Sequence, residues 1–248
     1  MKQNDSIIAF IMLENNNLND FSDQLKSDWD INIEIKNDKF HINDVDFLLK
    51  LAQFNVPDKE AEILINYNDI DEKTKEKILN HKSFLSINAN SKNTSFKDMA
   101  IIFNKVCYSI IKKNNVCAIL VGEINLLISS ETYLFEMDKY IEDNKYFPTN
   151  LWIRVDLFSD DNGNHAYTEG LKNFGKYEIM AYKTLRDAKS ITTLLTILSK
   201  NIIENILVLD DYNTMQTDDD YIGMFKFFDN KFIMIEKNLK DINQQNQQ

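Results

Sequence analysis

The sequence contains few glycines, prolines, cysteines and arginines. Its 248 residues include five glycines, two prolines and two cysteines, and arginine occurs only as Arg154 and Arg186. Glycine averages about 7% in soluble proteins, so most turns here must be made with Asn or Asp. The few glycines are expected where a side chain is not tolerated. Cys107 and Cys117 both lie in apolar surroundings, which excludes a disulfide framework and fits a reducing compartment.

Long apolar runs are also missing. The run at 7–13 follows Asp5, lacks a small-residue cleavage site and ends in polar residues, so it is predicted to be a buried strand and not a signal sequence. No apolar stretch approaches the roughly 18–20 residues that span a bilayer. We therefore expect a cytoplasmic protein with no membrane partner.

The charge balance is acidic. Asp and Glu number 39 against 28 Lys and Arg, which gives a formal net charge of −11. An acidic surface repels phosphate backbones, and the scarcity of arginine removes the side chain best suited to bind them, so we expect no nucleic-acid partner. The charge fits a protein partner with a basic surface, or it serves solubility alone.

Hydrophobic periodicity predicts an α+β fold. The apolar run at 7–13 and the alternating apolar residues at 31–35 and 151–157 predict strands, and helical spacing follows Ser95 and Ser129 or Ser130. Thr184 to Asp187 reads as a capping box for another helix, and 222–236 as a hairpin that turns at Asp229-Asn230. We expect a mixed, largely antiparallel sheet with helices packed on it. The order of elements permits two ferredoxin-like halves around one sheet.

No segment rich in Pro, Gly or Ser divides the chain. Residues 1–242 are therefore predicted to form a single α+β domain. Residues 243–248 are polar and of low complexity, and they are predicted to be a disordered tail.

Three of the five glycines lie in the segment 160–179. Asn162-Gly163 is typical of a hairpin turn. The run Tyr167-Thr168-Glu169-Gly170-Leu171, followed by Phe174-Gly175 and Glu178-Ile179, resembles the Tyr-Thr-x-Gly-Leu, Phe-Gly, Glu-Ile pattern of a bacterial family of unknown function, the one numbered four-two-six-one. The resemblance covers about the last two-thirds of the chain, from Phe84 onward. It implies no known reaction, catalytic residue or cofactor.

The same motif has a packing explanation. Gly170 and Gly175 bracket Leu171 and Phe174, so a tight turn would place two apolar side chains in the core. Glu178 is expected to accept backbone hydrogen bonds from that turn. The predicted structural motif comprises Gly163, Thr168, Gly170, Leu171, Phe174, Gly175 and Glu178.

One set of residues in this segment could carry chemistry. His165, Tyr167 and Glu169 alternate along a predicted strand and would share one face. An imidazole beside a phenol and a carboxylate is a candidate acid–base set for a small, hydrolase-like enzyme. The neighbouring acids do not keep the register of a calcium loop, and zinc spacings, phosphate-binding glycine loops and nucleophile elbows are absent from the sequence. We predict no metal site, cofactor or catalytic residue.

The densest negative charge is a run of three aspartates flanked by aromatic residues. Such a loop could attract a basic partner, with the aromatic side chains as anchors, or it is simply a solvated loop. We expect a non-enzymatic bacterial interaction protein, of which an immunity protein that neutralises a toxin is one form. An enzyme and a structural subunit of a larger assembly are the alternatives, and the oligomeric state is open. The candidate binding residues are His165, Tyr167, Glu169, Tyr212, Asp218, Asp219, Asp220 and Tyr221.

Overall fold

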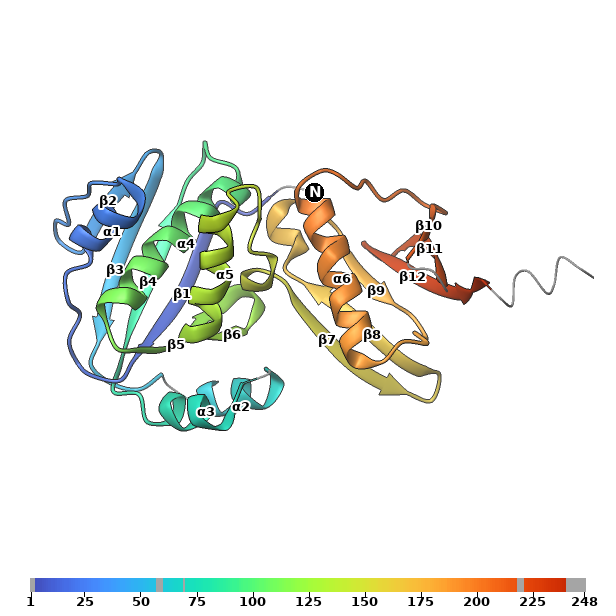
Figure 1. Ribbon diagram of the computed structural model, residues 1–248, viewed down its shortest axis with the longest axis horizontal. Helices are drawn as coiled ribbons and strands as arrows, with labels where there is room; N and C mark the ends of the chain where they lie inside the picture. The colour runs from blue at the N-terminus through green and yellow to red at the C-terminus, as the bar shows by residue number, and fades with distance from the viewer. Residues whose placement is uncertain (1–2, 57–59, 69, 218–220, 240–248) are drawn as a thin grey trace, which may run out of the picture. The chain divides into compact units, whose positions relative to one another are not determined.

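The computed structural model describes residues 3–56, 60–68, 70–217 and 221–239. Over these residues the chain forms six α-helices and twelve strands, and the strands make two six-stranded sheets (Figure 1). The prediction of an α+β fold with largely antiparallel pairing and packed helices is confirmed. The strands are divided between two sheets, however, where the sequence led us to expect one.

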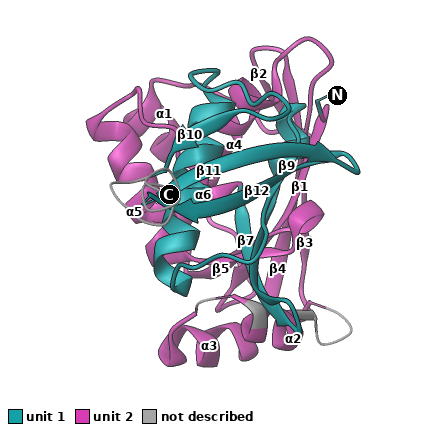
Figure 2. Ribbon diagram, turned by 90° about the vertical axis from the view of Figure 1, so that its right-hand side faces the viewer, with its two compact units in different colours: residues 1–3, 153–248 teal, residues 4–152 magenta. Residues whose placement is uncertain are grey.

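The chain divides into two compact units (Figure 2). The N-terminal unit comprises residues 4–152, and the C-terminal unit comprises residues 153–248 together with 1–3. The boundary falls between Trp152 and Ile153, where the composition does not change. The division into units reflects contacts within the folded chain and does not report whether the units unfold together. The single domain predicted for residues 1–242 therefore stays a prediction. The tail predicted at 243–248 lies outside the described residues.

The sheet of the N-terminal unit contains only antiparallel pairs among its described strands. Ser6–Leu13 lies between Ser83–Asn90 and Val116–Val121 and is antiparallel to both, as is the inserted strand of a ferredoxin-like split βαβ unit. The strand predicted at 31–35 is irregular, and only Lys36 bridges to Lys39. The strand order is β2-β3-β4-β1-β5-β6, with β1 at Ser6–Leu13, β2 at Lys39–Ile42, β3 at Val45–Ala52, β4 at Ser83–Asn90, β5 at Val116–Val121 and β6 at Leu126–Ser129.

Helices cover both faces of this sheet, which explains why all six residues of β5 are buried. On one face lie α1 (Ser22–Trp29), α4 (Phe96–Lys113) and α5 (Ser130–Glu142), and on the other lie α2 (Glu60–Tyr67) and α3 (Glu72–Leu79) (Figure 1). The side chains of Ser95 and Ser129 accept hydrogen bonds from the first turns of α4 and α5. These two helix starts were predicted correctly.

The sheet of the C-terminal unit is mixed. The β9–β12 pair is parallel, and the other described pairs are antiparallel. The connection from β9 to β12 includes α6 (Ala188–Ile203), β10 and β11. The order is β10-β11-β12-β9-β8-β7, with β7 at Arg154–Asp160, β8 at Gly163–Glu169, β9 at Glu178–Ala181, β10 at Thr214–Gln216, β11 at Tyr221–Phe228 and β12 at Lys231–Asn238.

Helix α6 packs across β7 and β8 on one face of this sheet (Figure 1). Its buried side chains, among them Ile191, Leu195 and Leu198, form the core with buried strand residues such as Ala166 and Ile179. By strand alternation, the opposite face of the sheet carries the half-buried Tyr167, Met180 and Ile233.

Helix α6 starts three residues later than its predicted capping box implies. Asp187, and not Thr184, is the N-cap, because its carboxylate accepts the N–H of Ser190 at 2.9 Å. The hydroxyl of Thr184 instead accepts the N–H of Arg186 and donates to Glu236. The β7–β8 turn also differs by one residue, since Asp161 and Asn162 form it and Gly163, with φ 131°, begins β8.

The glycine motif forms the tight turn expected from the sequence. Gly170 (φ 125°) and Gly175 (φ 70°) flank a 3-10 helix at Leu171–Phe174, whose two apolar end residues are buried. The carboxylate of Glu178 accepts the N–H groups of Gly170 at 3.0 Å and Lys172 at 3.1 Å. Its second oxygen accepts the hydroxyl of Thr168 at 2.8 Å. Burial raises the pKa of Glu178, and these hydrogen bonds oppose the shift.

Candidate functional site

The β7–β8 hairpin and the start of α6 enclose a pocket of about 250 Å³ in the C-terminal unit. Its strand side comes from residues 157–159 of β7 and from Asn164 and His165 of β8. Its helix side comes from the loop that leads into α6 and from the first turn of the helix. The lining residues on that side are Thr184, Arg186, Asp187, Ala188 and Ile191.

Strand β7 ends the sheet and exposes two large apolar side chains. Among the described strands it pairs only with β8. Leu157 is 47% exposed and Phe158 is 45% exposed. Adjacent exposed apolar residues on an edge strand are a feature that soluble proteins usually avoid or use for binding.

The outer edge of β7 also presents backbone hydrogen-bonding groups. Asp160 pairs with Gly163 across the two-residue turn, so this pair and every second pair from it are hydrogen-bonded. Val155, Leu157 and Ser159 lie in the alternate pairs, and their N–H and C=O groups therefore point away from β8. The carbonyl of Asn164, opposite Ser159, accordingly points away from β7 and accepts the N–H of Thr184 at 2.9 Å.

His165 lies beneath this edge and is closed off from solvent. It is 1% exposed, and its ring stacks on Phe158 with centroids 5.0 Å apart and lies 4.9 Å from the ring of Tyr182. Its Nδ1 accepts the N–H of Lys183 at 3.3 Å, so Nε2 carries the proton and donates to Oδ1 of Asp160 at 3.0 Å. This hydrogen bond is the main cause that lowers the pKa of Asp160.

Tyr167 and Glu169 share the face of His165, but the three side chains are spread along the strand. Residues two apart on a strand have Cα atoms about 6.8 Å apart, and among the described residues no hydrogen bond joins these three side chains. Glu169 forms an ion pair with Arg154, which also contacts Asp156 at 2.8 Å. Burial first, and then the charges of Glu178, Glu169 and Asp156, raise the pKa of Tyr167 to about 12. His165 and Glu169 thus have different polar partners, and the charge of Glu169 acts on Tyr167.

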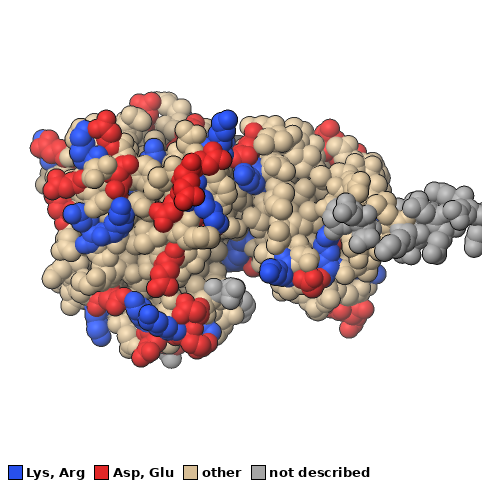
Figure 3. All heavy atoms as spheres, viewed as in Figure 1, with Lys and Arg blue, Asp and Glu red and all other residues tan. Residues whose placement is uncertain are grey.

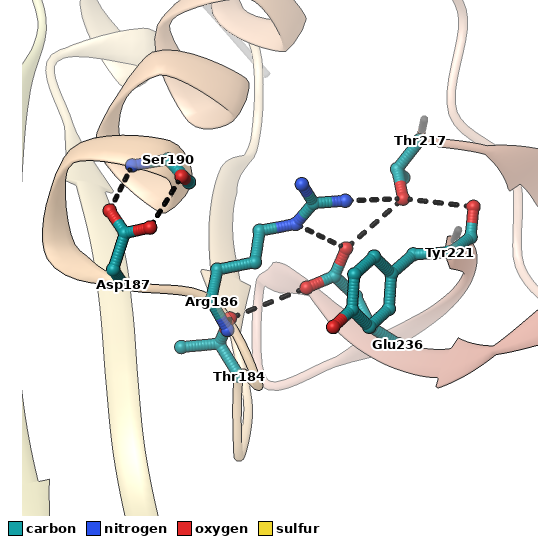
Figure 4. Close-up of polar contacts among 7 residues, drawn as sticks. All are labelled: Thr184, Arg186, Asp187, Ser190, Thr217, Tyr221 and Glu236. Carbon is teal, nitrogen blue, oxygen red and sulfur yellow. Dashed lines mark hydrogen bonds and ion pairs between the residues drawn. The ribbon is translucent and has the colours of Figure 1, made fainter. Parts of the chain in front are cut away.

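A buried ion pair lies on the helix side of the pocket (Figure 4). Nε of Arg186 donates to Oε1 of Glu236 at 2.8 Å, and the two side chains are 9% and 1% exposed. Arg186 also donates to the hydroxyl of Thr217 at 2.9 Å, and its guanidinium lies 4.8 Å from the ring centroid of Tyr221. The network joins the loop before α6 to β11 and β12, which fixes one wall of the pocket.

The remaining predicted binding residues do not gather around this pocket. Tyr212 is 61% exposed, with Lys226 6.0 Å from its ring centroid. Tyr221 is half-buried against Arg186. Asp218, Asp219 and Asp220 lie outside the described residues.

Charge on the molecular surface is mixed in sign. On the face shown in Figure 3, Lys and Arg intermix with Asp and Glu over the N-terminal unit, and uncharged residues dominate the middle of the C-terminal unit. Within the described ranges, no three His, Cys, Asp or Glu side chains are grouped as metal ligands would be. Of the helices that the structure describes, none combines the length and apolar character needed to cross a membrane.

A larger depression of about 730 Å³ lies in the N-terminal unit beside the edge strand β2. Its lining is mostly exposed, and Glu34 and Lys36 within it pair with each other at 2.9 Å. Binding sites for small molecules are usually concave and largely apolar, with a few convergent polar groups. This open and charged lining lacks that character.

Comparison with protein families, curated proteins and solved structures finds no match to this chain. The resemblance to the family of unknown function therefore stays a prediction. The sequence did not identify Leu157, Phe158 or the pair Arg186–Glu236 as functional candidates. The rarity of arginine was a sequence feature that could have drawn attention to Arg186, which is one of two arginines in the chain.

Proposed function

We propose that this chain is a non-enzymatic protein-interaction module whose partner carries a basic surface. The observation that carries the proposal is the outer edge of β7, where exposed Leu157 and Phe158 stand beside a pocket and between carboxylates. Apolar side chains anchor interfaces, and surrounding charge selects the partner and speeds its encounter.

The surroundings of the candidate acid–base set support binding over catalysis. A general base must reach the proton that it removes, whereas His165 is enclosed by two aromatic rings and hydrogen-bonded at both nitrogens. Glu169 is held by Arg154. These contacts give both side chains structural roles in the hairpin.

An immunity protein that neutralises a toxin in the bacterial cytoplasm is the specific form of this proposal. The net charge of −11 suits a basic toxin. Cys107 and Cys117 are buried free thiols, which suits a reducing compartment.

The first test is affinity purification of the tagged full-length chain from its native cell, with bound proteins eluted by salt and identified by mass spectrometry. We expect a basic protein that is lost at high ionic strength, since screening weakens such contacts. Folded bait that retains nothing above an untagged control would overturn the proposal.

The toxin form has its own test, which is co-expression with a toxin encoded by a neighbouring gene. Growth should be rescued and the two proteins should co-purify. A toxin that stays active and unbound would reject this form while leaving other partners open. The competing enzyme hypothesis requires an activity that is lost in His165→Phe.

A further inference from the structure

We propose that β7 and the adjacent pocket bind an extended peptide segment by strand addition, with an apolar side chain of the peptide in the pocket and basic side chains at alternate positions. This inference rests on the proposed interaction function and specifies its geometry and its ligand. The occupant is a segment of a partner protein, recognised through its backbone and through one anchoring side chain.

The first support is the set of backbone groups at the free edge. Val155, Leu157 and Ser159 direct their N–H and C=O groups outward, and none of them makes a backbone hydrogen bond to another segment of the described chain. An extended peptide beside β7 satisfies these groups through main-chain hydrogen bonds, which is how strand addition obtains affinity.

The size of the pocket supports a side chain as its occupant. Sites for drug-sized molecules measure about 300–1,000 Å³, and this pocket measures about 250 Å³. Leu157 on the strand side and Ile191 on the helix side give it apolar walls. Every second side chain of an added strand points to the sheet face that carries the helix, so one of them can enter a pocket between the edge strand and the helix.

The charges on β7 select basic residues at the intervening positions. Asp156 and Asp160 lie on the sheet face opposite α6, with side chains 38% and 48% exposed. Arg154 already pairs with Asp156, so Asp160 contributes the larger share of the attraction. Because side chains alternate along an added strand, residues next to the apolar anchor point toward these carboxylates. Lys or Arg at those positions therefore completes the recognition pattern.

The probes are synthetic peptides selected from a linear phage-displayed library on the full-length protein. We expect selected sequences with an apolar residue flanked by Lys or Arg, and binding that is lost when those residues are changed to Glu. Fluorescence anisotropy then measures each dissociation constant.

A scan of peptide N-methylation tests the backbone geometry. In an antiparallel or parallel added strand, every second amide faces β7. Methylation of those amides should weaken binding at least about tenfold, and methylation of the intervening amides should change it less than about threefold. Binding that is insensitive to this alternation would overturn strand addition.

Ser159 provides matched variants of the protein. Ser159→Ala removes the hydroxyl that donates to Asn164 but keeps the outward N–H, and should bind within about twofold of the parent. Ser159→Pro removes the outward N–H without removing a bond to β8, a position where edge strands accept proline. It should bind about tenfold or more weakly. Circular dichroism checks that both variants fold. If the proline variant does not fold, the scan of peptide N-methylation alone tests strand addition.

The pocket has a second matched pair on α6. Ala188→Leu fills the pocket from an exposed position in the first turn, whereas Thr193→Leu adds a leucine to an exposed position outside the pocket lining. Only Ala188→Leu should weaken binding, by about tenfold. Equal affinities for the two variants would contradict the anchoring role of the pocket.

Three further outcomes are decisive. A partner that is retained equally by the parent and by folded Ser159→Pro would overturn strand addition and leave the proposed interaction function intact. A dimer in sedimentation that dissociates in Ser159→Pro would show that a second copy of this chain occupies β7, which overturns the peptide proposal. Absence of both peptide and partner binding would reject this inference and the proposed function together.

Discussion

Glu178 holds a carboxylate inside the C-terminal unit, where one oxygen accepts two backbone N–H groups and the other accepts the hydroxyl of Thr168. Glu178→Gln preserves an oxygen for the two amides, and its NH₂ group can donate to Thr168, whose hydroxyl also accepts. Glu178→Ala leaves the amides of Gly170 and Lys172 unpaired. We predict a loss of about 2–5 kcal/mol of unfolding free energy for Ala and less than about half of that for Gln, measured by urea unfolding. Equal losses would contradict the hydrogen-bonding role.

Glu178 also predicts a dependence of stability on pH. Burial raises its pKa in the folded protein above the ordinary value of 4.5. The folded state therefore binds more protons than the unfolded state between these two values, and stability from this group falls as the pH rises through that window. The stability of the parent relative to Glu178→Gln should decline as the pH rises above 4.5 and then level off. A relative stability that rises with pH in urea titrations would contradict this sign.

Gly170 is required by its backbone conformation. At φ 125° and ψ −20° a side chain is strained, so Gly170→Ala should lower the unfolding free energy by about 1–3 kcal/mol. Gly122→Ala is the control, since its Cβ would meet only ordinary contacts at 3.5 and 3.9 Å. Thermal unfolding should separate the two variants, and a stable Gly170→Ala would show that the turn adjusts.

At the scale of elements, Arg186 and Glu236 join the loop before α6 to β12. Arg186→Met should cost about 3–5 kcal/mol, because it leaves the buried carboxylate of Glu236 without its cation. Arg186→Met combined with Glu236→Leu should recover part of that loss, because no buried charge remains. A double variant as unstable as the sum of the two single variants would show that the ion pair has no coupling energy.

The sequence predicted elements where local chemistry decides them. Ser95 and Ser129 precede long apolar periodicities, and both cap helices. Thr184 carried the same kind of signal but bonds to Glu236, 52 residues away, so a tertiary contact replaced a local one. Ile31, Ile33 and Ile35 alternate as a strand would, yet no partner strand pairs with them among the described residues. Local patterns do not contain such long-range partners.

At the scale of the whole molecule, the two units provide a test of independent folding. Both tryptophans, Trp29 and Trp152, belong to the N-terminal unit, and both take part in aromatic contacts within it. Tryptophan fluorescence therefore reports unfolding of that unit alone, whereas far-ultraviolet circular dichroism reports both. We predict that the two urea transitions of the full chain do not coincide. Coincident transitions would favour the single cooperative domain predicted for residues 1–242.

The location of the candidate site could be predicted only in part. The glycine-rich segment drew attention to the β7–β8 hairpin, and its turn was predicted to within one residue. The alternation at 151–157 predicted a strand but could not reveal that β7 ends its sheet, because strand order depends on contacts distant in sequence. His165, Tyr167 and Glu169 were placed correctly on one face, while their enclosing partners Phe158, Tyr182 and Arg154 became visible only in the structure.

The most direct test of binding at β7 is amide hydrogen exchange. The exchange is measured by NMR on the full-length protein with and without a selected peptide. We predict that the amides of Val155, Leu157 and Ser159 become protected when the peptide binds. The amide of Phe158, already in a hydrogen-bonded pair with His165, should change little. Protection that appears elsewhere and leaves these three amides unchanged would contradict strand addition at β7.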